Sequence, residues 1–155
     1  MVGVEEIVSR LRSLRNEKNI GGMARFGITF KAEVLGVPKP VLRRMAREIG
    51  RDTELALELW ETNIHEARIL ATMIADPEEF GEEHARKRVG DVDNWDLSDQ
   101  LAMNLLWRTS YARELAEEFC RSDREYTARV EYVVIATIVR KTDNPDEELL
   151  LKFQN

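Results

Sequence analysis

Apolar residues recur along most of the chain at the three- and four-residue spacing that is typical of an amphipathic helix. This pattern predicts helices over residues 7–14, 23–26, 42–49, 53–60, 64–74, 82–89, 95–107, 111–120 and 124–138. The last segment is rich in β-branched residues, so a strand is the competing interpretation, although its length favours a buried helix. The chain is therefore predicted to be all-helical with short connections.

Glycine and proline mark several of the expected boundaries. Residues 20–22 (Ile-Gly-Gly) are expected to break the first helix, and residues 35–40 are expected to form a turn that leads into the next one. Gly50 is a natural helix stop. Residues 76–77 (Asp-Pro) and 144–145 (Asn-Pro) each carry the cap-then-proline signal of a new helix start.

The predicted helices also repeat. Residues 66–68, 98–100 and 127–129 each open a more apolar helix, at intervals of roughly 30 residues, and shorter polar helices lie between them. This alternation favours an all-α fold in which antiparallel helical hairpins form a right-handed stack, a HEAT-like α-solenoid. A single domain over residues 1–155 is expected, and a plain helical bundle is the alternative.

The composition is that of a soluble, charge-rich protein, since 43% of the residues are hydrophobic, 34% are charged and the net charge is −6. The acidic balance argues against binding nucleic acid through bulk charge, although it is compatible with a local basic face. With Cys120 as the single cysteine, an internal disulfide is excluded and a cytoplasmic location is expected. No apolar run approaches the length of a transmembrane helix, so no membrane association is expected.

Several enzyme classes lack their signatures in this sequence. It contains no Gly-rich phosphate loop, no nucleophile elbow and no HExxH pair, which argues against nucleotide hydrolysis, serine hydrolases and zinc proteases. Two histidines and one cysteine also make a structural zinc site a poor interpretation.

The start of one predicted helix is the strongest candidate for chemistry. Asp93 or Asn94 can cap this helix, and Trp95 and Asp99 share one of its faces because they are four residues apart. An indole beside a carboxylate can hold a cation against its π-face while a negative charge lies close by. The alternative is a buried Trp95 and a solvated Asp99. In a stack of hairpins, the more apolar helices lie side by side along one inner face. Asp99 and Arg129 would then approach each other from two neighbouring helices of that face.

Segments along nearly the whole chain resemble those of a known family. These segments are Met23-Ala24-Arg25-Phe26, Leu35-Gly36-Val37, Leu57-Glu58-Leu59-Trp60, Trp95-Asp96-Leu97-Ser98-Asp99 and Arg129. The fourth matches a Trp-Asp-x-x-Asp motif, and the order and spacing of the set are more specific than any one member. The sequence is thus similar to the AlkD-like DNA alkylation repair enzymes, which are HEAT-repeat alkylpurine DNA glycosylases.

The resemblance implies an enzyme that removes cationic N3- and N7-alkylated purines from double-stranded DNA by hydrolysis of the N-glycosidic bond, without a metal or cofactor. By position, Asp99 matches the family's catalytic carboxylate and Trp95 an aromatic that contacts the lesion and the deoxyribose. Arg129 matches a residue that contacts the DNA backbone near the lesion. A fixed carboxylate suits this reaction, because bond cleavage leaves positive charge on the sugar.

The sequence departs from the family at its C-terminal end. The family usually continues past Asn155 with another repeat pair, which carries a second aromatic wall of the site, so this chain resembles a shortened member. An exposed terminal repeat near residues 149–153 is expected to be able to pair with a second copy as a homodimer. The alternative function is a non-catalytic helical-repeat module that binds nucleic acid or a protein partner.

Other residues compete for functional roles. Lys39, Arg43, Arg44 and Arg47 are candidate DNA-backbone contacts, and residues 86–88 are a second basic cluster, but solvated helix faces are the alternative for both. The acids that compete with the proposed catalytic carboxylate are Glu66, Asp91 and Asp96. The residues expected in the core or in a helix-start role include Trp60, Trp107, Cys120 and His65.

Overall fold

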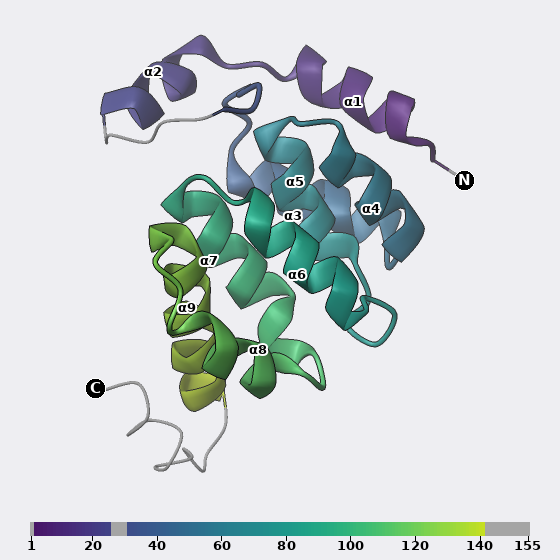
Figure 1. The fold of residues 1–155 in the computed structure, drawn as a ribbon. Helices are drawn as coiled ribbons and strands as arrows, with labels where there is room; N and C mark the ends of the chain where they lie inside the picture. Colours follow the sequence, from purple (N-terminus) through teal and green to yellow (C-terminus); the bar gives the residue numbers. More distant parts are fainter. Residues whose placement is uncertain (1, 26–30, 142–155) are drawn as a thin grey trace. The chain divides into compact units, whose positions relative to one another are not determined.

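The computed structural model of the chain describes residues 2–25 and 31–141. All regular secondary structure in these ranges is helical, which confirms the all-α prediction. The helices are α1 (Val4–Ser13), α2 (Glu17–Arg25), α3 (Lys39–Ile49), α4 (Thr53–Glu61), α5 (His65–Ile74), α6 (Glu82–Asp91), α7 (Trp95–Asn104), the 3-10 helix η1 (Leu106–Arg108), α8 (Ala112–Phe119) and α9 (Glu125–Lys141) (Figure 1). No described helix combines the length and apolar character that a membrane crossing requires.

The chain forms two compact units, Met1–Glu79 and Phe80–Asn155. The first unit contains α1 to α5, and the second contains α6 to α9. Each unit has buried apolar residues of its own. The expectation of a single domain over residues 1–155 stays a prediction.

In the first unit, α4 packs against α5, α3 packs against α5, and α1 contacts both α4 and α5. The apolar stripes predicted from the sequence supply the buried faces of these helices. Ile7 and Leu11 are buried on α1, and Leu42 and Met45 are buried on α3. Trp60 is also buried, which confirms its predicted place in the core.

A buried carboxylate fixes the chain ahead of α3. Glu66 is 1% exposed, and its two carboxylate oxygens accept the backbone N–H groups of Leu35 and Gly36 at 2.9 and 2.8 Å. Gly36 has a φ of +76°, and a Cβ at this position would lie 2.4 Å from the carbonyl oxygen of Asn16. Only glycine therefore fits this connection without a shift of the backbone.

The break between the first two helices lies earlier than predicted. Helix α2 runs through Gly21 and Gly22, and the chain leaves the helical path at residues 14–16 instead. The side-chain oxygen of Asn16 accepts the backbone N–H of Asn19 at 3.1 Å and so caps the start of α2. A helical glycine costs only about 1 kcal/mol relative to alanine, so the two glycines do not end the helix.

The predicted helix start at Asp76 and Pro77 is wrong. These residues form a single turn, in which Asp76 accepts the N–H of Glu78 on its carboxylate at 2.9 Å and the N–H of Glu79 on its carbonyl at 3.0 Å. The backbone at Gly81 is extended, and α6 begins only after it. Asp76 and Pro77 therefore form a turn, but no helix starts at them.

In the second unit, α7 and α8 both pack against α9, and α6 contacts α9 as well (Figure 1). Leu97 and Leu101 are buried on α7, and Val130 and Val134 are buried on α9. The β-branched segment is thus a buried helix and not a strand. Helix α7 ends earlier than predicted, at Asn104, where the chain tightens into η1.

Two predictions concern residues 142–155, which lie outside the described part of the chain. They are the helix start at 144–145 and the dimer contact near 149–153. Both stay predictions.

Candidate functional site

The first turn of α7 positions two of the predicted site residues. The side-chain oxygen of Asn94 accepts the backbone N–H of Leu97 at 2.8 Å, so Asn94 is the cap of this helix. Trp95 and Asp99 then lie one turn apart, while Leu97 is buried. Trp95 is 39% exposed, and the side chain of Asp99 is 20% exposed. The interpretation of Trp95 as a core residue is therefore wrong, because its indole lies at the surface.

Arg129 joins these two residues from α9. Its Nε donates to Asp99 Oδ1 at 2.7 Å and its terminal NH2 group donates to Asp99 Oδ2 at 2.9 Å, which makes the pair bidentate. The same guanidinium carbon lies 5.8 Å from the ring centroid of Trp95, within cation–π range. The structure thus brings the side chains of Trp95, Asp99 and Arg129 together, although their functional roles stay predictions.

In this cluster, Asp99 and Arg129 neutralise each other's charge. The hydrogen bond to Asp99 raises the pKa of Arg129 above its usual value, so Arg129 keeps its charge at any physiological pH. Both oxygens of Asp99 accept from one guanidinium, and the pair is only partly buried. A charged ligand can therefore compete for either partner: an anion for Arg129, or a cation for Asp99 and the face of Trp95.

The competing acids have other surroundings. Both carboxylate oxygens of Glu66 accept backbone N–H groups in the buried connection of the first unit, so Glu66 has a structural role. Asp96 is 4% exposed, as a first-turn acid of α7, and Asp91 is exposed at the end of α6. Asp99 is the acid that the structure sets beside an exposed aromatic ring and an arginine.

The basic residues predicted to contact DNA lie on α3, in the first unit. Arg43, Arg44 and Arg47 are exposed, and Lys39 is half-buried. Lys39, Arg43 and Arg47 are spaced by four residues, so they follow one helical face. The pKa of Glu48 is lowered, mainly by its ion pair with Arg10 and to a smaller extent by the charge of Arg44. The role of this basic face stays a prediction.

The second basic cluster, at residues 86–88, is already engaged in structure. Arg86 pairs with Glu82 at 2.7 Å and also with Glu118, and these contacts raise its pKa. Arg88 is buried. This cluster is therefore not an open basic face.

Two residues predicted to lie in the core are less buried than expected, and a third holds the helix-start position predicted for it. Trp107 and Cys120 are half-buried rather than fully in the core, and Cys120 follows the last turn of α8. His65 is buried at the start of α5, where its backbone N–H donates to the carbonyl of Glu33 at 2.8 Å.

An open groove beside the cluster was not predicted. It has a volume of about 500 Å³ and is lined chiefly by one face of α9, with Met103 from α7. Arg129 lies on it, together with Tyr132 and Arg140. The sequence signal that could have revealed it is the spacing of these three residues on α9, but the many apolar residues of that helix concealed which face points outward.

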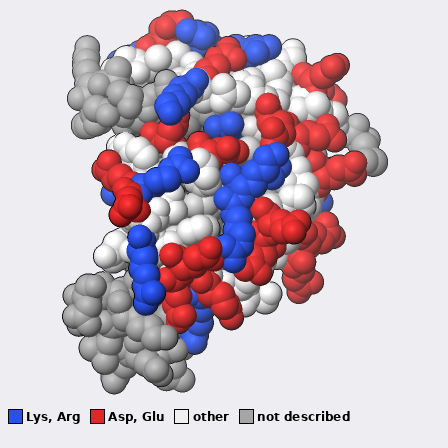
Figure 2. All heavy atoms as spheres, in the orientation of Figure 1, with Lys and Arg blue, Asp and Glu red and all other residues white. Residues whose placement is uncertain are grey.

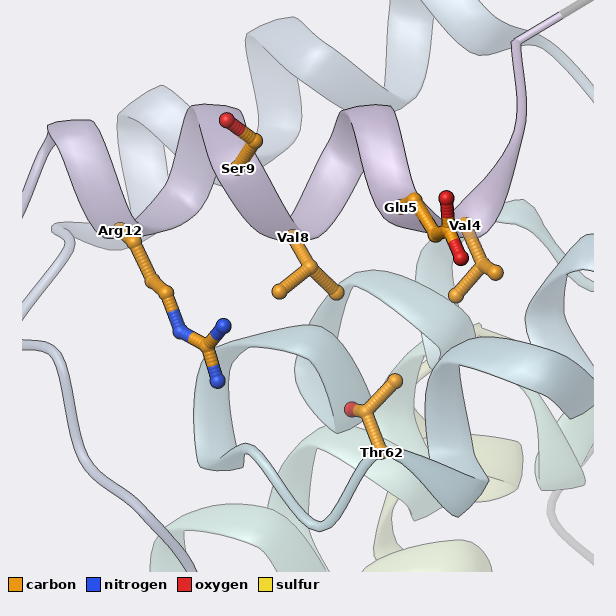
Figure 3. A pocket seen from close by; sticks show the side chains of 6 residues that line it. All are labelled: Val4, Glu5, Val8, Ser9, Arg12 and Thr62. Atoms are coloured by element: carbon orange, nitrogen blue, oxygen red, sulfur yellow. The ribbon is translucent and has the colours of Figure 1, made fainter.

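A second hollow lies in the first unit, between α1 and the end of α4. Its volume is about 360 Å³, and Figure 3 shows Val8 and Arg12 of α1 and Thr62 among its lining residues. Arg12 is paired with Glu33 at 3.1 Å. This hollow carries no combination of acid and aromatic like that around Asp99.

The surface charge is mixed. Figure 2 shows acidic and basic side chains lying among one another on the face that it draws. Over residues 2–25 and 31–141, no group of three or more His, Cys, Asp or Glu side chains has an arrangement that could hold a metal ion.

Comparisons with known proteins bear on the family and the fold of this chain. The sequence profile described as "DNA alkylation repair enzyme" matches residues 7–154. A solved structure described as "a new family of proteins related to the HEAT-like repeat DNA glycosylases with affinity for branched DNA structures" superposes with a TM-score of 0.82 over 92% of this chain, at 22% identity. This chain spans 60% of the length of that structure. None of the curated proteins matches significantly. The fold is thus of the predicted HEAT-like helical kind.

Proposed function

We propose that this chain, which belongs to the DNA alkylation repair enzyme family, is a DNA glycosylase that excises cationic N3- or N7-alkylated purines from duplex DNA. The observation that carries the proposal is the convergence of Trp95, Asp99 and Arg129 at a solvent-accessible position. These three side chains supply a cation-binding face, a carboxylate and an anion-binding group within one site.

The proposed reaction uses the carboxylate to stabilise charge. The N-glycosidic bond breaks and its electron pair leaves with the purine, which departs as a neutral alkylated base. The sugar carbon is left cationic, and Asp99 stabilises this charge and orients a water molecule. Water adds to the sugar carbon and gives its proton to the solvent, which leaves an abasic site. Trp95 attracts the cationic purine through its π-face.

The ion pair must open for this reaction. In the free protein both carboxylate oxygens of Asp99 accept hydrogen bonds from Arg129. A DNA phosphate presents the same bidentate geometry to a guanidinium, so it can take the place of the carboxylate. We propose that Arg129 moves from Asp99 to the DNA backbone on binding, and that Asp99 is thereby released towards the lesion. The basic face of α3, formed by Lys39, Arg43, Arg44 and Arg47, is proposed to supply further backbone contacts.

The test is the release of 7-methylguanine from methylated duplex DNA. Wild-type protein should release the base well above the spontaneous rate, and Asp99→Asn should lower the single-turnover rate by at least about a hundredfold, as loss of a group that stabilises transition-state charge does. Asp123→Asn, at an exposed aspartate in the connection before α9, is the matched control and should keep the wild-type rate. Circular dichroism should confirm that both variants fold.

Two results would decide against the proposal. Release at the spontaneous rate by wild-type protein in excess over DNA would rule out the enzyme. Equal activity of wild type and Asp99→Asn would preserve the enzyme but remove Asp99 from its catalytic role.

A second candidate function is binding without catalysis, with branched DNA as the ligand. Two observations favour it: the description of the similar solved structure names affinity for branched DNA, and Asp99 is neutralised by Arg129 in the free protein. Under this function, wild-type protein should bind a four-way junction more tightly than a linear duplex of the same sequence and release no base. Asp99→Asn should then bind the junction at least as tightly as wild type.

A further inference from the structure

The groove along α9 extends the candidate site in one direction. Arg129, Tyr132, Val133, Ala136 and Arg140 follow a three- and four-residue spacing, so they share one face of the helix. At 1.5 Å per residue, the two arginines are separated by roughly 16 Å along the helix axis. The groove therefore has a cationic group near each end.

The middle of the groove is apolar and open. Tyr132 is 54% exposed and Met103 is 36% exposed, so neither side chain is buried in the core. Alanine at position 136 and valine at position 133 are small, and they leave a hollow of about 500 Å³ between the larger groups. An exposed aromatic ring between two arginines matches a nucleotide, whose base stacks on aromatic side chains while its phosphates contact cations.

The groove and the candidate site share a residue. Arg129 lines the groove and also pairs with Asp99 beside Trp95. A DNA strand whose phosphate replaces Asp99 on Arg129 is thereby positioned at the entrance of the groove. Once a phosphate has replaced Asp99 on Arg129, the two arginines of the groove outnumber its lining acid, Glu125, which favours an anionic occupant.

From these observations we infer that the α9 groove binds an unpaired, unstacked nucleotide of the DNA, next to the Trp95–Asp99–Arg129 site. Tyr132 stacks on the base, and Arg129 and Arg140 contact phosphates of the same strand on either side of that nucleotide. This inference rests on the proposed binding of DNA, but it does not require catalysis. It assigns to the protein a preference for DNA with a displaced base over fully paired duplex.

The experiment compares two fluorescently labelled duplexes of identical sequence, one fully paired and one with a single unpaired thymine, by fluorescence anisotropy. Wild-type protein should prefer the bulged duplex. Tyr132→Ala should weaken binding to the bulged duplex about five- to one-hundredfold, as loss of one stacked base does, and change binding to the paired duplex less than about twofold. Tyr132→Phe keeps the ring and should retain the preference.

The phosphate contact is tested separately. Arg140→Ala should weaken binding to the bulged duplex more than to the paired duplex, and should reduce the slope of log affinity against log salt concentration for the bulged duplex by about one. Arg121→Ala removes an exposed arginine outside the groove and should change neither quantity.

Three results would overturn the inference: no preference of wild type for the bulged duplex, equal loss of affinity for both duplexes in Tyr132→Ala, or no binding of DNA at all. If the protein binds DNA, the base-release assay can succeed or fail independently of the other two results. A protein that prefers bulged DNA through Tyr132 but releases no base would retain the groove assignment and lose the glycosylase. A protein that releases base, but whose DNA binding does not depend on Tyr132, would retain the glycosylase and lose the groove assignment.

Discussion

Glu131 is a carboxyl group that the fold buries on α9, at 1% exposure. Burial raises its pKa to about 8, and the nearby Cys120 thiol offsets this effect only in part. Burial and the proximity of Glu131 also raise the pKa of Cys120. Glu131 is therefore protonated in the folded protein at neutral pH, whereas in the unfolded chain it ionises near its usual value of 4.5.

This difference predicts a loss of stability as the pH rises. Between the unfolded pKa and about 8 the folded state binds more protons than the unfolded state, so the free energy of unfolding falls as the pH increases through that window. Glu131→Gln removes the titration. We expect the variant to be more stable than wild type at pH 8.5, by on the order of 2–3 kcal/mol, and the difference to shrink towards pH 5.5.

Urea denaturation at several pH values between 5.5 and 8.5 measures this effect. Glu117→Gln, at an exposed position of the neighbouring helix α8, is the control and should follow the wild-type pH profile. A Glu131→Gln profile parallel to that of wild type would show that Glu131 does not carry the pH dependence.

At the scale of residues, helix spacing places Trp95 and Asp99 on one face, and the repeat together with the resemblance to a family made them the strongest candidate site. Arg129 followed from the repeat and from the resemblance to a family. Tyr132 and Arg140 were not predicted as a site. Helix α9 is apolar on more than one face, and which face is buried depends on its packing against α7 and α8, which periodicity does not specify.

At the scale of elements, the connection from α2 to α3 depends on one glycine and one buried acid. Gly36→Ala should destabilise the protein by about 2 kcal/mol or more, because the residue has positive φ and the added Cβ would lie 2.4 Å from a carbonyl oxygen. Gly22→Ala is the matched control. Gly22 is helical with open space around it, so alanine should stabilise the protein by about 0.5–1 kcal/mol.

Thermal or urea unfolding of the two variants measures the change in the free energy of unfolding that each substitution causes. The assignment of strain to Gly36 fails if both substitutions shift the free energy of unfolding in the same direction by similar amounts.

The positions of most helices could be predicted from the sequence, because apolar stripes on α1, α3 and α9 become buried faces. The boundaries were less predictable. Residues 20–22 contain two weak helix formers, yet the cap at Asn16 and a hydrogen bond from the Asn19 amide to the Gly36 carbonyl, at 2.9 Å, set the start of α2 elsewhere. The cap is local, but the Asn19–Gly36 contact joins residues 17 apart in sequence, so a local pattern does not contain it.

At the scale of the whole molecule, the net charge of −6 limits how DNA can bind. Binding must rely on local arginines, because a bulk acidic charge repels the phosphates. We expect a slope no steeper than about −5 for log affinity against log salt concentration, because the proposed contacts of α3 and α9 would neutralise about six phosphates at most.

Titration of duplex DNA at salt concentrations from 50 to 200 mM, as is customary for this effect, measures the slope. Arg129→Ala should reduce its magnitude by about one, whereas Arg121→Ala should leave it unchanged. A slope steeper than about −6 would indicate a broad basic surface and contradict this expectation.

The bidentate pairing of Asp99 with Arg129 also has a practical consequence. Under the proposed reaction, replacing the acid by asparagine would remove the chemical step and, at the same time, the internal competitor for the DNA backbone. An Asp99→Asn protein should therefore hold on to DNA that it does not process. Such a variant would serve as a substrate trap, with which the DNA structures that this protein encounters can be isolated and sequenced.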